Sequence, residues 1–367
     1  MYVTKTVDDP LFGPLRYIIS DVNSECKFDK NTIACTIPLT DMDVQLDGEV
    51  FTCCRDWNPC SIGNTDVDDL KTIWNSERAN ALRNSILDGS YKYCNAHTCP
   101  AMISGKHHRL VPMEDAKKMS LALPRSIGLT IDKSCNLVCP SCRREKIIEQ
   151  TPEAEARARR ILQLVMDFAF SEPHKNPINL TMDGCGEVFF SAIYREFFET
   201  ARIFKTPELW PRLTIVLCTN GVMMTEKVQK KYDILFNLTR YLRVSIDAGN
   251  QESYDKVRAG GDWDLLWKNL DYWYSVNKTR SKWTWNIVLQ RDNFESLPDL
   301  IRLANNYPEN LPEIYIVNLL DWGIGTPEEF EKKAVWSPKS PNHQRLREIL
   351  NSPEVRDYPG MYQHSIK

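Results

Sequence analysis

The sequence contains no apolar run long enough for a transmembrane helix, and its first residues, Met1–Pro10, lack the apolar core of a signal peptide. It also lacks a dominant sign of charge: the formal net charge is −3, and acidic and basic residues are mixed along the chain. Such a surface carries no electrostatic footprint for nucleic acid or for a membrane. The sequence therefore predicts a cytoplasmic protein without nucleic-acid or membrane partners.

Cysteine is missing from the last part of the chain. Of the 12 cysteines in 367 residues, seven lie between positions 26 and 99, three between 135 and 142, two at 185 and 218, and none beyond. Thiols stay reduced in the cytosol, so this number of cysteines indicates metal binding or catalysis rather than disulfides. The distribution divides the chain into a cysteine-rich N-terminal part and a cysteine-poor remainder.

Three cysteines stand close together as Cys135-x3-Cys139-x2-Cys142, directly after the β-type run 126–131. Three thiolates at this spacing can hold three irons of a cubane [4Fe–4S] cluster and leave the fourth iron open. The array resembles the signature of the radical S-adenosylmethionine (radical SAM) superfamily, in which the open iron binds SAM. Ser141 departs from the aromatic residue that usually precedes the last cysteine in that family. A structural zinc site is the alternative, but it needs a fourth ligand, and the next cysteine is distant.

A second group of cysteines precedes this triad. Asp47-Gly48 between two short apolar stretches predicts a β-hairpin that would bring Cys35 and Cys53 together at its open end. A helix predicted over residues 68–87 then leads to Cys94 and Cys99. Residues 1–34 show no clear pattern and are expected to wrap the outside, and residues 105–125 predict a linker.

The spacing Cys35-x12-Gly48-x4-Cys53, followed by Cys94-x4-Cys99, resembles the auxiliary-cluster domain called SPASM, or its shorter relative, twitch. In the family this domain usually follows the catalytic barrel, whereas here it precedes it. The resemblance implies one auxiliary [4Fe–4S] cluster, for which these four cysteines suffice. The remaining N-terminal cysteines are interpreted as ordinary thiols: Cys26, Cys54 and Cys60. A second auxiliary cluster is the less favoured variant, and a four-cysteine zinc site is the alternative.

After the linker, strands and helices alternate regularly. Strands are predicted at 126–131, 177–183, 212–218, 240–246, 283–289 and 313–319, with helices near 152–171, 191–204, 225–236, 251–276 and 294–306. Six β/α units in a row predict a parallel sheet, open or curled into a partial barrel. By resemblance, the radical SAM fold is a (β/α)6 partial TIM barrel. The predicted domains are an α+β auxiliary-cluster domain (1–104), a linker (105–125), the barrel (126–322) and a C-terminal extension that packs on or closes it (323–367).

The carboxyl ends of the predicted strands carry residues suited to ligand binding, which is where β/α barrels place their chemistry. The second strand leads into a glycine–glutamate motif, the third into Thr-Asn-Gly and the fourth into Ser-Ile-Asp. The resemblance implies that these ends bind SAM and that an arginine in the following helix helps to hold the SAM carboxylate. The implied SAM-binding residues are Gly184, Gly186, Glu187, Asn220, Ser245, Asp247 and Arg258.

Two further residues are candidates for contact with a substrate. Cys185 lies inside the glycine motif and is hypothesised to donate a hydrogen atom to a substrate radical, although a small residue in a tight turn is the simpler interpretation. Trp322 directly follows the last predicted strand. Cys218 ends an apolar strand and is interpreted as core packing.

The resemblance implies an enzyme that cleaves SAM reductively to a 5′-deoxyadenosyl radical and abstracts a substrate hydrogen. An auxiliary cluster could accept the electron that a substrate radical releases. The resemblance therefore favours a net oxidation of a peptide side chain or a small metabolite, either by dehydrogenation or by cross-linking. The electron donor would be of the flavodoxin or ferredoxin type. A redox-neutral radical epimerase and, from another class, a non-catalytic zinc-stabilised binding protein remain as alternatives.

Overall fold

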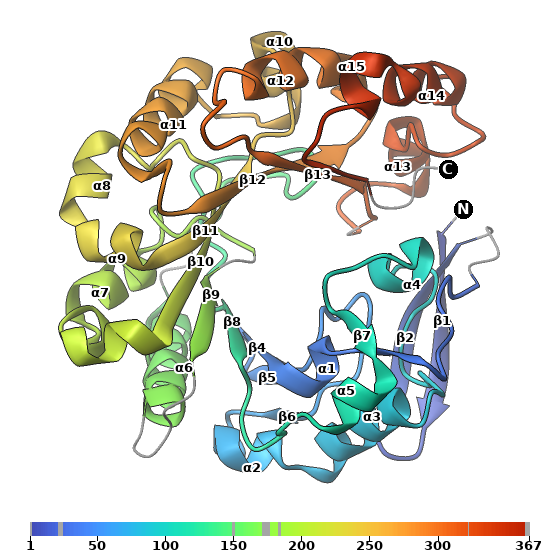
Figure 1. The fold of residues 1–367 in the computed structure, drawn as a ribbon, viewed down its shortest axis with the longest axis vertical. Coiled ribbons are helices and arrows are strands. Elements are labelled where there is room, and N and C mark those ends of the chain that lie inside the picture. The colour runs from blue at the N-terminus through green and yellow to red at the C-terminus, as the bar shows by residue number, and fades with distance from the viewer. Residues whose placement is uncertain are drawn as a thin grey trace. The chain divides into compact units, whose positions relative to one another are not determined.

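The computed structural model describes residues 2–20, 25–148, 151–170, 177–182, 185–321 and 323–363 (Figure 1). The chain divides into two compact units. We call residues 1–132, 150–184 and 206–214 the N-terminal unit, and residues 133–149, 185–205 and 215–367 the C-terminal unit. Within the described ranges, no helix combines the length and apolar character needed to cross a bilayer.

The N-terminal unit holds the hairpins and short helices of the cysteine-rich region and the first two strands of the predicted barrel. Its elements are β1 (Tyr2–Asp9), β2 (Gly13–Ser20), β3 (Ile33–Cys35), α1 (Ile37–Thr40), β4 (Asp41–Gln45), β5 (Glu49–Phe51), β6 (Gly63–Asn64), α2 (Leu70–Trp74), α3 (Glu77–Leu87), α4 (Pro100–Ser104), β7 (Leu110–Pro112), α5 (Met113–Lys117), β8 (Ser126–Thr130), α6 (Pro152–Phe170), β9 (Ile178–Met182) and the 3₁₀ turn η2 (Pro207–Arg212).

The predicted hairpin is confirmed as β4 and β5, which pair antiparallel across a turn where Gly48 has a φ of +81°. Only glycine adopts this left-handed conformation without a steric penalty. The strand order within this unit is β9-β8-β4-β5-β6, and β4 pairs parallel with β8. The hairpin therefore extends the sheet that contains β8 and β9, and the division of the chain does not coincide with the predicted domain boundaries.

Two N-terminal segments differ from the expectation. Residues 1–34 include a hairpin in which β1 and β2 pair antiparallel from Tyr2↔Ser20 to Asp9↔Gly13. The stretch 105–125, expected to be a linker, contains β7 and α5. β7 pairs antiparallel with β3, so this stretch is part of the structure that holds Cys35.

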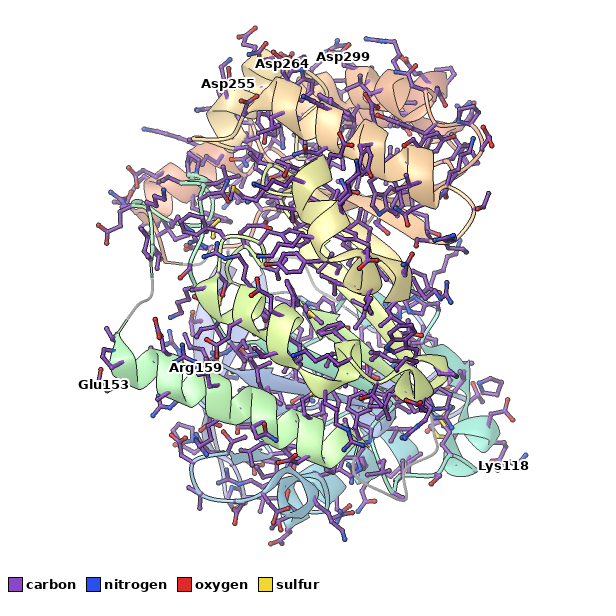
Figure 2. The ribbon with its side chains drawn as sticks, turned by 90° about the vertical axis from the view of Figure 1, so that its left-hand side faces the viewer. Lys118, Glu153, Arg159, Asp255, Asp264 and Asp299 are labelled. Carbon is purple, nitrogen blue, oxygen red and sulfur yellow. The ribbon has the colours of Figure 1, made fainter. Side chains whose placement is uncertain are left out.

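Helix α6 illustrates how sequence pattern and packing agree. It begins with Pro152, which suits the first turn of a helix, and Ile161 and Val165 are fully buried on one side. Glu153 and Arg159 project from it toward the solvent (Figure 2).

The C-terminal unit contains a parallel sheet with helical connections. Its elements are α7 (Ala192–Thr200), the 3₁₀ turn η1 (Arg202–Phe204), most of β10 (Leu213–Thr219), α8 (Glu226–Lys231), α9 (Asp233–Leu238), β11 (Thr239–Ser245), α10 (Gln251–Val257), α11 (Trp263–Asn277), β12 (Lys282–Leu289), the 3₁₀ turn η3 (Phe294–Ser296), α12 (Leu297–Ala304), β13 (Glu313–Asn318), α13 (Pro327–Lys333), α14 (His343–Asn351), α15 (Pro353–Arg356) and β14 (Met361–Gln363).

Strands β10 to β14 are parallel and lie in chain order. Helices α8, α9, α11 and α12 lie along one side of them (Figure 1). Acidic side chains point outward from α10, α11 and α12, namely Asp255, Asp264 and Asp299 (Figure 2). The six predicted strands are confirmed to within one or two residues, whereas the predicted helix 251–276 is broken between α10 and α11. At that break Gly260 has a φ of +85°, and a side chain at Gly261 would collide with the ring of Tyr254.

Candidate functional site

The four cysteines predicted for an auxiliary cluster line one pocket of the N-terminal unit. Cys35 ends β3, Cys53 follows β5, and Cys94 and Cys99 flank the turn before α4. We call this the cysteine pocket; its other lining residues are mostly apolar: Phe28, Ile37, Pro38, Trp57, Tyr91, Pro100, Ala101, Met102 and His107. The fold thus brings together thiols from segments that are up to 64 residues apart in the chain.

Tyr91 holds two parts of the cysteine pocket together. Its hydroxyl accepts a hydrogen bond from the backbone N–H of Cys35 and donates one to the carbonyl of Ile33, each at 2.9 Å. Its carbonyl accepts the N–H of Cys94 at 3.0 Å. Tyr91 has a φ of +51°, an uncommon conformation for a bulky residue that usually marks a structural or functional constraint. The sequence offered no signal for this role.

Burial keeps the thiols of the cysteine pocket protonated in the metal-free protein. Burial raises the pKa of Cys35 to about 12, and it raises the pKa values of Cys53, Cys94 and Cys99, to which the neighbouring thiols also contribute. Thiols in such surroundings stay neutral unless positive charge balances their ionised form. Four thiols facing one pocket are the donor set of a [4Fe–4S] cluster, so the residues present fit this group.

The other N-terminal cysteines stand outside the lining of the cysteine pocket. Cys26 donates to the carbonyl of Phe28 at 3.4 Å, Cys54 lies 3.9 Å from a carboxylate oxygen of Asp56, and Cys60 is 1% exposed. Within the described part of the chain, no three Cys, His, Asp or Glu side chains converge as they would around a single metal ion. His107 lines the pocket although the sequence analysis placed it in a linker.

The predicted triad lies in a loop of the C-terminal unit, which we call the triad loop (133–147). The loop closes on itself because the N–H of Cys135 donates to the carbonyl of Ile147 at 3.0 Å and that of Cys142 donates to the carbonyl of Cys139 at 2.8 Å. Cys135 and Cys139 are buried, and burial raises the pKa of each thiol; Cys142 is exposed. One side of this thiol group is therefore open to solvent.

Each sulfur of the triad receives a polar donor. Asn220 Nδ2 lies 3.9 Å from Cys135 Sγ, Arg258 Nη1 lies 3.7 Å from Cys139 Sγ, and Arg143 Nη2 lies 3.4 Å from Cys142 Sγ. Asn220 and Arg258 were predicted as SAM-binding residues, whereas Arg143 was not singled out. Hydrogen bonds to cluster-ligating sulfurs are a principal means by which proteins tune iron–sulfur sites. These donors fit a cluster bound to the triad.

Glu187 is 1% exposed and lies where the chain passes the triad loop, with its N–H donating to the carbonyl of Ser134 at 2.8 Å. Its Oε1 accepts from the Thr219 hydroxyl at 2.7 Å and from the N–H of Phe189 at 3.3 Å, and its Oε2 accepts from the N–H of Asn220 at 2.6 Å. Burial raises its pKa despite these donors. A carboxylate has about four acceptor positions, so one on Oε2 remains for a further donor such as an amine.

Asp247 and Arg258 form a buried ion pair beside the triad. Arg258 Nε lies 2.8 Å from Asp247 Oδ2, and the side chains are 13% and 2% exposed. Burial raises the pKa of Asp247, and the charge of Arg258 opposes this shift. Asp247 has a φ of +63°, and this backbone is held by Asn293 Nδ2, which donates to the carbonyl of Asp247 at 2.7 Å. Backbone strain of this kind in a polar residue is common at functional sites.

The remaining predicted site residues fall into two groups. Cys185, Gly186 and Ser245 are partly exposed, and the carbonyl of Cys185 accepts a hydrogen bond from Arg143. Gly184 and Trp322 lie outside the described residues. The hydrogen-donor role suggested for Cys185 and the substrate contact suggested for Trp322 stay predictions.

One known family matches the segment that carries most of the N-terminal cysteines. Residues 35–100 match the SPASM family, described as an iron–sulfur cluster-binding domain. This segment is a SPASM domain. The match begins at Cys35 and includes the whole set of cysteines that line the pocket, so it confirms the predicted domain type and the iron–sulfur cluster as its cofactor. No curated protein matches the chain in a sequence search.

Three solved structures share limited similarity with this one. SuiB of Streptococcus suis aligns with a TM-score of 0.43 and 15% identity over 68% of this chain and 53% of its own. AnSMEcpe with bound AdoMet aligns with a TM-score of 0.37 and 13% identity over 53% and 51%. BtrN in complex with AdoMet and 2-DOIA aligns with a TM-score of 0.26 and 17% identity over 64% and 84%. The aligned part of this chain spans about half the length of SuiB and of anSMEcpe.

Proposed function

We propose that the protein is a radical SAM enzyme with an auxiliary iron–sulfur cluster in its SPASM domain. The observation that carries the proposal is the triad loop, in which Cys135, Cys139 and Cys142 are each contacted by a separate polar donor. When bound there, a reduced [4Fe–4S] cluster would supply the electron that cleaves SAM to methionine and a 5′-deoxyadenosyl radical. The SPASM domain in the same chain supports iron rather than zinc as the metal.

The residues around the triad would bind and orient SAM. Glu187 retains an acceptor position for the methionyl amine, and its three hydrogen bonds fix the direction of that position. Arg258 would offer positive charge to the SAM carboxylate, while its bond to Asp247 limits its rotamers. Gly184, Gly186, Asn220 and Ser245 are proposed as further SAM contacts. The fold proposed for this part is the (β/α)6 partial barrel, supported by the parallel order of β10 to β14.

The proposed net reaction is an oxidation of a peptide side chain or a small metabolite, by dehydrogenation or cross-linking. Its support is the cysteine pocket, because a fully ligated auxiliary cluster could accept the electron that a substrate radical releases. A flavodoxin- or ferredoxin-type protein would return electrons to the triad. Cytoplasmic location, expected from the sequence, is part of the same proposal.

The test is a measurement of iron and acid-labile sulfide per chain after anaerobic reconstitution, together with 5′-deoxyadenosine formed from SAM under reducing conditions. The native protein should hold about eight irons, and a Cys135/Cys139/Cys142→Ala variant about four, as two cubanes require. The variant should form no 5′-deoxyadenosine. A native protein with four or fewer irons whose content is unchanged in the variant would refute the triad cluster, and stoichiometric zinc would favour a metal-stabilised binding protein.

A further inference from the structure

Arg143, directly after the last cysteine of the triad, is tied to both ends of the triad loop. Its side chain is 9% exposed. Nη1 donates to the carbonyl of Lys133 at 2.8 Å, and Nη2 donates to Cys142 Sγ at 3.4 Å and to the carbonyl of Cys185. One guanidinium therefore joins the first residue of the loop, the last cysteine and the glycine motif that follows β9.

The planar guanidinium suits this arrangement, since it presents several N–H donors in fixed directions. A lysine ammonium at this position would be a point charge on a flexible chain, unable to hold three acceptors in one plane. The neighbouring Arg144 carries the same charge but is exposed, and it contacts Glu329 at 3.1 Å and the carbonyl of Ile324 at 2.6 Å. The two arginines thus share sequence context and charge but differ in burial and partners.

We propose that Arg143 is a positioning residue of the triad, with two effects. It holds the triad loop in the conformation in which Lys133, Cys142 and Cys185 all lie within reach of one guanidinium. It also donates to the Cys142 sulfur and brings positive charge to it, which raises the reduction potential of a cluster bound there, because reduction adds negative charge to the sulfurs. The second effect rests on the proposed function, and the first does not.

The positioning effect is tested on the metal-free protein by hydrogen exchange over residues 133–147. Losing a hydrogen bond from a charged group should make amides of the triad loop exchange about tenfold faster in Arg143→Met. Arg144→Met is the matched control and should exchange like the native protein. Arg143→Lys, which keeps the charge, should also exchange faster, since it lacks the planar fork. Equal exchange in Arg143→Met and the native protein would overturn the positioning role.

The electronic effect is tested by redox titration of the reconstituted protein, followed by electron paramagnetic resonance. The triad signal is the one absent from the Cys135/Cys139/Cys142→Ala variant. Its midpoint should shift to a more negative potential in Arg143→Met, less in Arg143→Lys, and not in Arg144→Met. An unchanged midpoint with iron retained would overturn this effect alone. A native protein that binds no iron at the triad would overturn the proposed function and this effect with it, while hydrogen exchange would still decide the positioning role.

Discussion

The cysteine pocket and the triad loop use the same side chain in opposite surroundings. The pocket gathers Cys35, Cys53, Cys94 and Cys99 from distant segments and surrounds them mainly with apolar side chains. The triad loop supplies three cysteines within eight residues, leaves Cys142 exposed, and places an asparagine and two arginines against the sulfurs.

This difference indicates different tasks for the two sites. Four thiols in an apolar pocket can saturate a cluster and keep water away from it, which suits a group that passes electrons without binding anything else. Three thiols with polar donors leave room for a ligand at the open position and provide charges to orient it. The SPASM match supports an iron–sulfur cluster as the occupant of the first site, and the proposed function gives the second site the cluster that binds SAM.

The largest effect is expected when cysteine ligands are removed from the cysteine pocket and the triad loop is left intact. We expect a Cys94/Cys99→Ala variant to lose about half its iron, which is one cubane, while it still forms 5′-deoxyadenosine from SAM. Iron analysis and product quantification after anaerobic reconstitution measure both. Cys54→Ala is the control, because Cys54 lies outside the lining of the pocket. Loss of SAM cleavage with iron retained at the triad would show that the two sites do not have separate tasks.

Breaking the buried ion pair between Asp247 and Arg258 should have the next largest effect. Arg258→Met leaves the carboxylate of Asp247 buried without its partner, which typically costs about 3–5 kcal/mol of the free energy of unfolding. Urea unfolding of the metal-free protein measures this cost. The double variant Asp247→Asn/Arg258→Met should recover much of it, because asparagine carries no charge and tolerates the left-handed backbone at this position. A double variant no more stable than Arg258→Met would contradict this account.

Sequence pattern predicted the parts of both sites that depend on local chemistry. The triad is contiguous, and strands β8 to β13 follow apolar runs whose length and flanking turns distinguish them from helices. The turn at Asp47-Gly48 likewise has a local signal. The cysteine spacing around Gly48 was sufficient to recognise the SPASM domain, which the family match confirms.

Features that depend on distant pairing were not predictable. No periodicity indicates that β4 pairs with β8, or that β7 pairs with β3 and makes a supposed linker part of the cysteine pocket. The β1–β2 hairpin did leave a signal, since four of the five residues in Val3-Thr-Lys-Thr-Val7 are β-branched, ahead of a turn that ends at Gly13. Arg143 and Tyr91 are ordinary residues in the sequence, and only their partners in the fold reveal what they do.

A smaller effect is expected from the framework of the cysteine pocket. Tyr91→Phe removes the hydroxyl that joins Cys35 and Ile33, leaving a buried N–H without its partner, which costs about 1–3 kcal/mol of the free energy of unfolding. The control Tyr241→Phe alters a tyrosine that is 46% exposed and should change the stability little. Urea unfolding of the metal-free protein compares them. Equal stability of the two variants would show that Tyr91 does not hold the pocket together.

The smallest expected effect concerns Cys60, a buried thiol outside the lining of the cysteine pocket, and the pH dependence of stability. Burial raises the pKa of Cys60 above that of an unfolded thiol, about 8.5. Above about pH 8.5 the folded chain keeps this proton whereas the unfolded chain loses it. The contribution of Cys60 to the free energy of unfolding is therefore fully present below about pH 8.5 and is lost as the pH rises toward the folded pKa. The loss is at most about 1.4 kcal/mol per pH unit. Cys60→Ala should therefore lose stability less steeply between pH 8.5 and 10.

Urea unfolding with reductant present measures these slopes, and parallel curves for the native protein and Cys60→Ala would contradict the assignment. The pocket thiols have pKa values raised in the same direction, so they steepen both curves of the metal-free protein equally. When the cluster holds them as thiolates, they carry no proton in the folded chain, so they oppose the loss of stability above pH 8.5 instead of adding to it. The iron-loaded protein should then lose stability less steeply than the metal-free protein, while the difference between the native protein and Cys60→Ala persists. This distinguishes thiols that bind the cluster from one that does not.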